Sequence, residues 1–320
     1  MLKRALSAAV GIGIFLGVCF GGLLPFTIGA TVIAILATWE WIAAYQHAQR
    51  VEAQAGDRLP MPGWLNAVNV LLVCAGIVFC PLVYLLQSRY KPQFPLPITK
   101  TTALLLVVPI IVFSLMTLRA RFVRQTLGGA RQWYGAVGMV YIGLLMSSLV
   151  WMRGLNLSYL AHGNGWTDKP VLSLLHIHVA PFGWAEAGAW RMLFVAICVW
   201  MTDTGAYFVG KSFGRHKIAP DLSPGKTVEG SIGGLATALL TGAVCGLFIH
   251  LPLKDGLAIG LIAGTVGQIG DLFESALKRE IGIKDFGAVM PGHGGALDRF
   301  DSILFVTPIA FCYLHFLAGL

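Results

Sequence analysis

"GSIGGLATALLTGAVCGLFIH", residues Gly230–His250, is a run of 21 residues without a single Asp, Glu, Lys or Arg. A helix of about 20 apolar residues spans the hydrocarbon core of a bilayer, because it satisfies its own backbone hydrogen bonds. Comparable runs recur along the 320 residues, of which 56% are hydrophobic and 12% charged. In soluble domains about a quarter of the residues are charged. We therefore predict an all-α, polytopic integral membrane protein and exclude a soluble one.

Nine segments of this kind are candidate membrane spans. The eighth is short and could be partly re-entrant, so the sequence predicts eight or nine helices. The first two are joined by almost nothing, which is typical of a tight hairpin. The first has a basic start like a signal peptide, but further spans follow at once, and we expect it to be retained. The nine candidates are approximately Leu6–Leu24, Phe26–Tyr45, Trp64–Leu86, Ala103–Leu118, Tyr134–Met152, Trp190–Phe208, Gly230–His250, Leu257–Asp271 and Ser302–Leu320.

The basic residues predict how the spans are oriented. With the N-terminus inside and nine spans, 16 of the 23 Lys and Arg residues fall on the cytoplasmic side, as the positive-inside rule favours. The isoelectric point near 9.3 then reflects topology and attraction to anionic headgroups or phosphates, and no nucleic-acid partner is predicted. All six Cys lie in apolar runs without a CxxC pair, so we interpret them as small buried hydrophobes.

The acidic residues are concentrated in the second half of the chain. Residues 203–301 contain ten of the fifteen acids, and the expected topology turns the loops 210–229 and 272–299 toward the cytoplasm. We therefore divide the chain into an N-terminal transmembrane region, residues 1–188, and a C-terminal catalytic region, residues 189–320.

Two carboxylate pairs stand at successive helix ends. Asp271 and Glu274 are three residues apart, as are Asp298 and Asp301, so each pair shares a helix face. Acids at the edge of the hydrocarbon are energetically costly and usually functional. Four carboxylates on two helix ends could hold Mg²⁺. The alternative, that the second pair only marks a helix start beside the anchor Arg299, leaves the first pair unexplained.

Positive charge and glycines lie between these pairs. Lys278, Arg279 and Lys284 are basic, and Gly-rich sequence around His293 lets backbone N–H groups approach an anion. His293 could donate to a phosphate or only cap a turn. Cations, acids and glycines together are the ingredients of a site for a polyphosphate with its metal.

The loop "SPGKTVEGSIGG", residues 223–234, contains the triplet Gly-Lys-Thr, which also ends the P-loop pattern. The P-loop pattern needs Gly at position 220, where this chain has Pro220, so that interpretation fails. A helix N-terminus beside hydroxyls and a Lys is still a reasonable anion site. Its candidate residues are Ser223, Lys226, Thr227 and Glu229.

Asp203 is a separate candidate, because it lies inside an apolar span more than one turn from the end. A lone carboxylate is costly there, which favours a functional group in a polar cavity over a satisfied core carboxylate.

These residues resemble a known signature, that of the phosphatidate cytidylyltransferases (CDP-diacylglycerol synthases). "DTGAYFVGKSFG", "SPGKT" and "EGSIGG" are similar to the rest of that family's catalytic half, and the resemblance covers about residues 200–302. The matching positions are Ser275-x-Leu277-Lys278-Arg279, Lys284-Asp285 and Pro291-x-His293-Gly294-Gly295-x-x-Asp298-Arg299-Phe300-Asp301.

The resemblance implies the reaction of CTP with phosphatidate to give CDP-diacylglycerol and pyrophosphate. It implies Mg²⁺ on Asp271, Asp298 and Asp301, with Glu274 and Asp285 as further ligands, and leaves a second monovalent or divalent cation open. The implied catalytic residues are Asp271, Asp298, Asp301, Lys226 and Lys284. The implied substrate-binding residues are Asp203, Ser223, Thr227, Glu229, Lys278, Arg279, His293 and Arg299.

The implied partners are CTP, phosphatidate and membrane lipids, with a homodimer by resemblance alone. The implied location is the bacterial inner membrane, with the site facing the cytoplasm. One alternative is a CTP-dependent enzyme acting on another lipid phosphate or a polyprenol. A secondary transporter would instead place acids near the midplane of repeated halves, and no repeat is evident.

Overall fold

The computed structural model describes residues 2–55, 63–89, 134–154, 186–249, 251–287 and 294–318. All regular secondary structure in these ranges is helical. The elements are α1 (Leu2–Phe20), α2 (Leu23–Ala55), α3 (Gly63–Gly76), α4 (Phe79–Arg89), α6 (Tyr134–Gly138), η2 (Met139–Leu144), α7 (Leu145–Arg153), α8 (Glu186–Phe213), α9 (Val228–Phe248), α10 (Leu253–Ile262), η5 (Ala263–Gly267), α11 (Gln268–Glu280), α12 (Leu297–Cys312) and η6 (Tyr313–Leu317).

The described residues include seven helical stretches long and apolar enough to cross a membrane, and a shorter apolar helix, Val10–Phe20. This confirms the prediction of an all-α polytopic membrane protein. The predicted hairpin is also present, since only Gly21 and Gly22 separate α1 from α2. Gly22 has φ +113°, a conformation that side chains with a Cβ rarely adopt. The predicted span Ala103–Leu118 lies outside the described residues.

The prediction of a short eighth span, Leu257–Asp271, is wrong, because the helix is longer at both ends. The elements α10, η5 and α11 form one 28-residue helix, Leu253–Glu280, which is about 42 Å long at 1.5 Å per residue and is not re-entrant. Residues 272–280, predicted as loop, continue the helix because Phe273, Ala276 and Leu277 bury an apolar face against the bundle. The last helix begins at Leu297, five residues before its predicted start.

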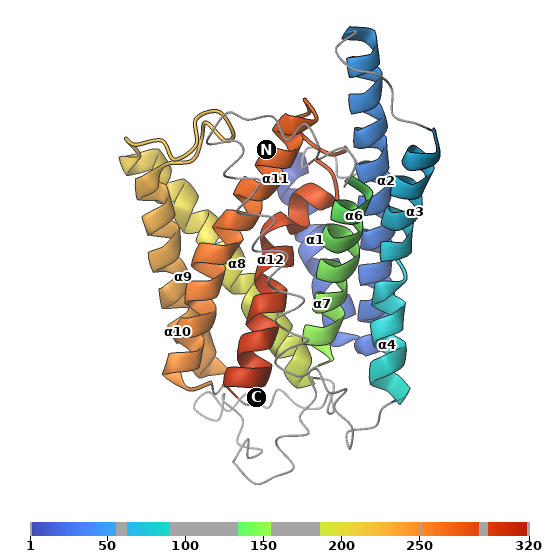
Figure 1. Ribbon diagram of the computed structural model, residues 1–320. Helices are drawn as coiled ribbons and strands as arrows, with labels where there is room; N and C mark the ends of the chain where they lie inside the picture. Colours follow the sequence, from blue (N-terminus) through green and yellow to red (C-terminus); the bar gives the residue numbers. More distant parts are fainter. Residues whose placement is uncertain are drawn as a thin grey trace.

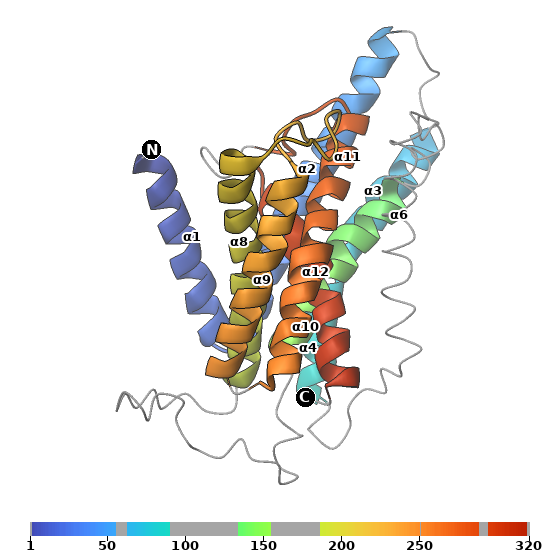
Figure 2. The same cartoon turned by 90° about the vertical axis from the view of Figure 1, so that its left-hand side faces the viewer.

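The two polar loops that follow α8 and α11 meet at one end of the bundle (Figures 1 and 2). The start of α1, the ends of α8 and α11 and the starts of α9 and α12 all lie at the upper end of Figure 1, opposite the C-terminus. We call this the charged end. The sequence analysis placed the loops that follow α8 and α11 on one side, and the structure agrees.

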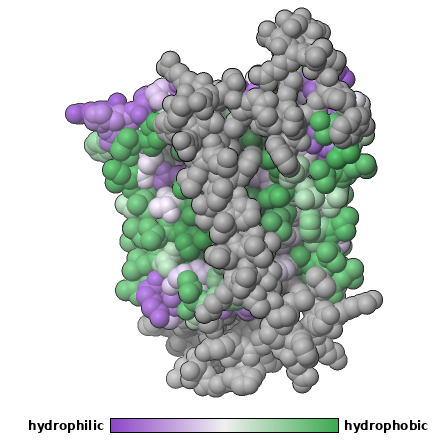
Figure 3. Space-filling model, viewed as in Figure 1, coloured by the Kyte–Doolittle hydropathy of each residue, from purple (hydrophilic) through white to green (hydrophobic). Residues whose placement is uncertain are grey.

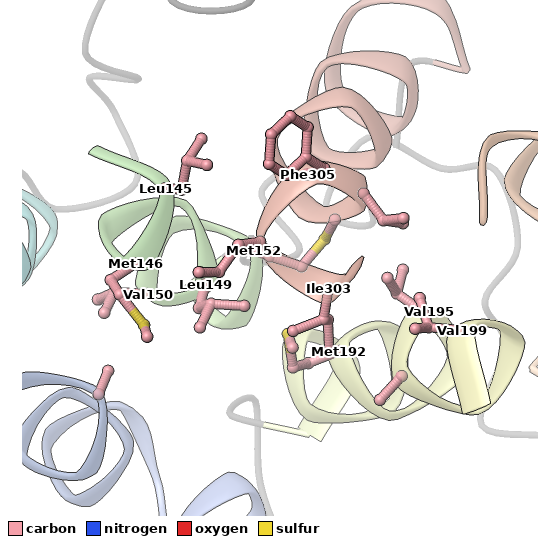
Figure 4. Close-up of a cluster of buried hydrophobic side chains, with 14 of the residues drawn as sticks. Leu145, Met146, Leu149, Val150, Met152, Met192, Val195, Val199, Ile303 and Phe305 are labelled. Atoms are coloured by element: carbon pink, nitrogen blue, oxygen red, sulfur yellow. The ribbon is translucent and has the colours of Figure 1, made fainter. Parts of the chain in front are cut away.

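The hydrophobic core lies where α7, α8 and α12 pack together (Figure 4). Buried side chains there include Leu145, Met146, Leu149, Val150, Met152, Met192, Val195, Val199, Ile303 and Phe305. The core is continuous across the boundary predicted at residue 188, and the division into two regions stays a prediction. On the face seen in Figure 3, hydrophobic residues form a band with hydrophilic residues above and below it, as suits a bilayer.

Small residues let α8, α9 and α10 approach one another closely. A Cβ on Gly205 would overlap the hydroxyl of Thr237, and a Cβ on Gly242 would overlap the backbone of Gly256. Such close approach is the usual way in which transmembrane helices gain packing energy. It holds the helices that carry the polar residues at the charged end in a fixed relation.

Candidate functional site

The charged cluster lies between the turn before α9 and the facing sides of α11 and α12. It consists of Lys226, Asp271, Glu274, Lys278, Asp298 and Asp301. The π-helical turn η5 directly precedes α11, and such turns are frequent at functional sites because they rotate the residues that follow. The structure therefore brings together both predicted carboxylate pairs and two of the predicted lysines.

Asp298 has a hydrogen-bond donor on each oxygen. The ammonium of Lys278 lies 2.8 Å from Oδ1, while the backbone N–H groups of Phe286 and Gly295 donate to Oδ2 at 3.0 and 2.8 Å. The side chains of Lys278 and Asp298 are only 13% and 4% exposed. Asp298 thus ties the segment between α11 and α12 to the side of α11.

Glu274 and Asp301 form a different kind of contact. Their carboxyl groups lie close enough to influence each other electrostatically, and the Ser302 N–H donates to Asp301 at 2.6 Å. Among the described residues, neither oxygen of the fully buried Glu274 has a hydrogen-bond partner. The nearest cation, the ammonium of Lys278, is 3.6 Å away. Glu274 is therefore a buried acid whose oxygens are available to a proton or a cation.

Lys226 connects the loop before α9 to α11. Its ammonium lies 2.7 Å from Asp271 Oδ2, and the two side chains are 21% and 33% exposed. The pair is open enough to exchange partners. In the part of the chain that the structure describes, no three His, Cys, Asp or Glu side chains converge as a ready-made metal site.

Asp203 and Arg299 belong to the same neighbourhood. Asp203 lies on α8, ten residues before its end at Phe213, and interacts electrostatically with Asp301, Asp271, Lys226 and Arg299. Its side chain is exposed, as is that of Arg299. A functional role for Asp203 stays a prediction.

The remaining residues of the loop before α9 hold its shape. Thr227 caps α9, accepting from the Gly230 N–H at 3.1 Å. Glu229 accepts from the N–H groups of Arg215 and His216 at 3.0 and 3.2 Å, and its other oxygen lies 2.6 Å from His216 Nδ1.

The turn that presents Lys226 is closed by backbone hydrogen bonds. The Ser223 N–H donates to Ala219 O, and the Lys226 N–H donates to Ser223 O. The predicted anion-binding loop is therefore a folded turn that presents Lys226 to α11, and its Thr and Glu side chains are engaged within it.

Of four further predicted residues, one lies in the last turn of α11, two follow this helix, and one lies outside the described residues. Arg279 donates to Ile283 O at 3.0 Å and so caps the end of α11. Lys284 and Asp285 are exposed, and neither has a hydrogen bond or ion pair to another described residue of the cluster. His293 lies outside the described residues.

The sequence analysis missed Glu40. This residue of α2 is 1% exposed, and its carboxylate accepts from the N–H groups of Ala296 and Leu297 at 3.0 and 3.1 Å. The signal was present, because Glu40 is a lone carboxylate within a predicted span. The cost argument that singled out Asp203 applies equally to it.

Known proteins are similar to this chain over nearly its full length. A sequence model of the cytidylyltransferase family matches residues 2–317. The chain belongs to the cytidylyltransferase family. The match extends the family resemblance from the predicted 200–302 to both halves of the chain, including α2 and its Glu40.

The individual relatives in the family are bacterial proteins. The phosphatidate cytidylyltransferase of Bacillus subtilis (strain 168) is 30% identical over 322 residues, covering 100% of this chain and 98% of that protein. That of Staphylococcus saprophyticus is 48% identical over 124 residues, or 38% of this chain and 48% of that protein. That of Staphylococcus aureus (strain COL) is 47% identical over the same length.

Proposed function

We propose that this member of the cytidylyltransferase family transfers the cytidylyl group of CTP to phosphatidate, releasing pyrophosphate and forming CDP-diacylglycerol. The observation that carries the proposal is the similarity to the Bacillus subtilis phosphatidate cytidylyltransferase across both chains. The charged cluster supports it, because a bilayer-bound phosphate and a polyanionic nucleotide can meet only near the end of a membrane bundle. The transporter alternative fits less well, since the acids gather at one end rather than at the midplane.

The residues of the cluster suit phosphoryl chemistry. The attacking oxygen belongs to a phosphate monoester that is already anionic, so the reaction needs no strong general base. Catalysis then depends on positioning the two phosphates in line and on neutralising the charge that develops. Lys226 can both position a phosphate and neutralise its charge, because its ammonium reaches from the turn before α9 to Asp271 of α11. Lys278 holds Asp298 and lies near the height expected for lipid headgroups.

The buried acids fit a divalent cation. The cluster contains four carboxyl groups and two ammonium groups, so two negative charges remain if all are ionised. Glu274 has two buried oxygens without a donor among the described residues; its acidic neighbour is Asp301, which in turn lies near Asp271. We therefore propose these three as the Mg²⁺ ligands, with Asp298 orienting them. Mg²⁺ held there would supply positive charge that neutralises the phosphates of CTP.

Several finer expectations belong to the same proposal. The charged end would face the cytoplasm of the bacterial inner membrane, with the N-terminus inside, as the distribution of Lys and Arg favours. Lys284 and Asp285 would contact phosphate or metal only after the segment that follows α11 has moved. Homodimerisation and a second cation stay predictions.

A labelling experiment tests the reaction. Purified protein in detergent is incubated with Mg²⁺, phosphatidate and CTP that carries the label on its α-phosphate. Cytidylyl transfer moves this label into the lipid phase, whereas a CTP-dependent kinase would leave it in the aqueous phase. Replacing phosphatidate by a polyprenyl phosphate separates the alternative acceptors. If the label stays aqueous while phosphatidate remains intact, the proposed reaction is wrong.

A further inference from the structure

Glu40 lies far from the signature in sequence but touches it in space. Its carboxylate oxygens accept from two consecutive N–H groups, those of Ala296 and Leu297, across a separation of 256 and 257 residues. Its side chain is fully enclosed in the bundle. A buried carboxylate with two backbone donors is a specific arrangement and not a stray surface acid.

The contact supplies something that α12 lacks. The first N–H groups of a helix have no partner inside the helix, and here the residue at the N-cap position is Ala296, which has no side-chain acceptor. Water cannot easily serve these groups in a buried position. Glu40 of α2 therefore caps the N-terminus of α12 by accepting these hydrogen bonds. Its negative charge also suits the positive end of the α12 dipole.

The α2 helix holds the neighbouring segment at two more points. A Cβ on Gly295 would come within 2.5 Å of the Glu40 carboxylate, so glycine is needed for this approach. One residue further along α2, Trp41 stacks on Phe286 with ring centroids 5.5 Å apart. The N–H groups of Phe286 and Gly295 are the two that bind Asp298.

These contacts link Glu40 to the charged cluster through the backbone. Leu297, which donates to Glu40, directly precedes Asp298, and Asp301 follows one turn later. Moving the start of α12 would therefore move both acids relative to Glu274 and Lys278. We infer that Glu40 is a positioning residue for the reaction, through which the N-terminal half of the chain fixes the place of Asp298 and Asp301.

The inference rests on the proposed function for its kinetic part and is tested with a matched control. Glu40→Gln keeps the size of the side chain but has one acceptor oxygen for two donors. Thr38→Val changes another buried polar residue of α2, whose hydroxyl has no hydrogen-bond partner among the described residues. Both variants are purified as full chains and compared by size-exclusion chromatography and melting temperature.

We expect Glu40→Gln to lower kcat about 10–100-fold and to raise the Mg²⁺ concentration for half-maximal activity, with KM for phosphatidate unchanged. Thr38→Val should retain kcat within about twofold. A role in bundle stability alone would lower the yield and melting temperature of Glu40→Gln without altering Mg²⁺ dependence in the folded fraction. If Glu40→Gln keeps the kcat and Mg²⁺ dependence of Thr38→Val, the positioning role is refuted.

Hydrogen–deuterium exchange gives a readout that needs no activity. The peptide that contains the amides of Ala296 and Leu297 should exchange about tenfold faster in Glu40→Gln than in Thr38→Val. The exchange measurement remains valid even if the protein does not act on phosphatidate. It therefore separates failure of the inference from failure of the proposed function. If Glu40→Gln does not fold, Glu40→Asp replaces it in the same measurements of kcat, Mg²⁺ dependence and exchange. This variant keeps the charge but has a shorter side chain. Unchanged exchange in the variant that folds would overturn the inference.

Discussion

Replacing Lys278 by Met removes the cation at the centre of the buried cluster. The Lys278 ammonium is 2.8 Å from Asp298 and 3.6 Å from Glu274, whose side chains are 4% and 0% exposed. After the substitution these acids have no cation at contact distance among the described residues. Lys226→Met is the matched control, since it removes the same charged group from an ion pair of similar length with Asp271.

The expected effects on stability differ because the burial of the acids differs. Removing one partner of a buried ion pair costs about 3–5 kcal/mol, since the remaining charge is left uncompensated. Asp298 keeps two backbone donors, so we expect the lower end of this range, near 3 kcal/mol. Asp271 is a third exposed, and water can replace its partner. For Lys226→Met we therefore expect a loss below about 1 kcal/mol.

Thermal unfolding in detergent measures the contrast. If the relation for soluble domains holds, with 1 kcal/mol corresponding to about 2–4 °C, Lys278→Met should melt about 6–12 °C lower than the unsubstituted protein. Lys226→Met should melt no more than about 4 °C lower. Adding Asp298→Asn to Lys278→Met removes an uncompensated charge and should restore part of the loss. Equal melting temperatures for the two single variants would refute the conclusion that burial controls these pairs.

Three further outcomes follow from the contacts at the site and between the helices. Lys226→Met should lower kcat about 10²–10³-fold in the labelled-CTP assay, because a cation aimed at the phosphates is lost; activity within tenfold would remove Lys226 from the phosphate site. Glu274→Gln should raise the Mg²⁺ concentration for half-maximal activity about 10–100-fold, and an unchanged titration curve would exclude it as a ligand. Gly205→Val should destabilise the protein by about 1–3 kcal/mol through overlap with Thr237, and Thr237→Ala should relieve part of this loss in a melting experiment.

The sequence predicted most of the spans because each is an uninterrupted apolar run, and length alone then decides that it can cross a bilayer. It failed at the end of α11, where charged residues suggested a loop. The stretch "DLFESALKRE", residues 271–280, is rich in strong helix formers, and its apolar residues recur at helical spacing. A helix that continues past the hydrocarbon does not need to be apolar all round. Amphipathic spacing, rather than charge content, was the relevant signal there.

For the site, spacing predicted which acids share a helix face, but not which cation each acid meets. The partners of Asp271 and Asp298 depend on how α11, α12 and the α9 turn are rotated and packed, and no local pattern encodes these tertiary relations. Thr227 was predicted to bind substrate, but its hydroxyl caps a helix, as Thr commonly does. Glu40 was overlooked because the search for costly intramembrane acids concentrated on the half of the chain that is rich in them.

The depth of the cluster explains how two substrates that share no solvent could react there. Asp271 lies 18 residues after Leu253, the first residue of α10, which is about 27 Å along the continuous helix. With the start of α10 at one edge of a hydrocarbon core about 30 Å thick, Asp271 and Glu274 fall close to the other edge. Lys278, about 38 Å along, then lies among the headgroups. A phosphate anchored by two acyl chains is confined to this same depth, and α11 extends past it into water, where a nucleotide can approach. The acids are thus placed neither at the midplane, where an ion pathway would need them, nor in free solution, where the lipid could not follow.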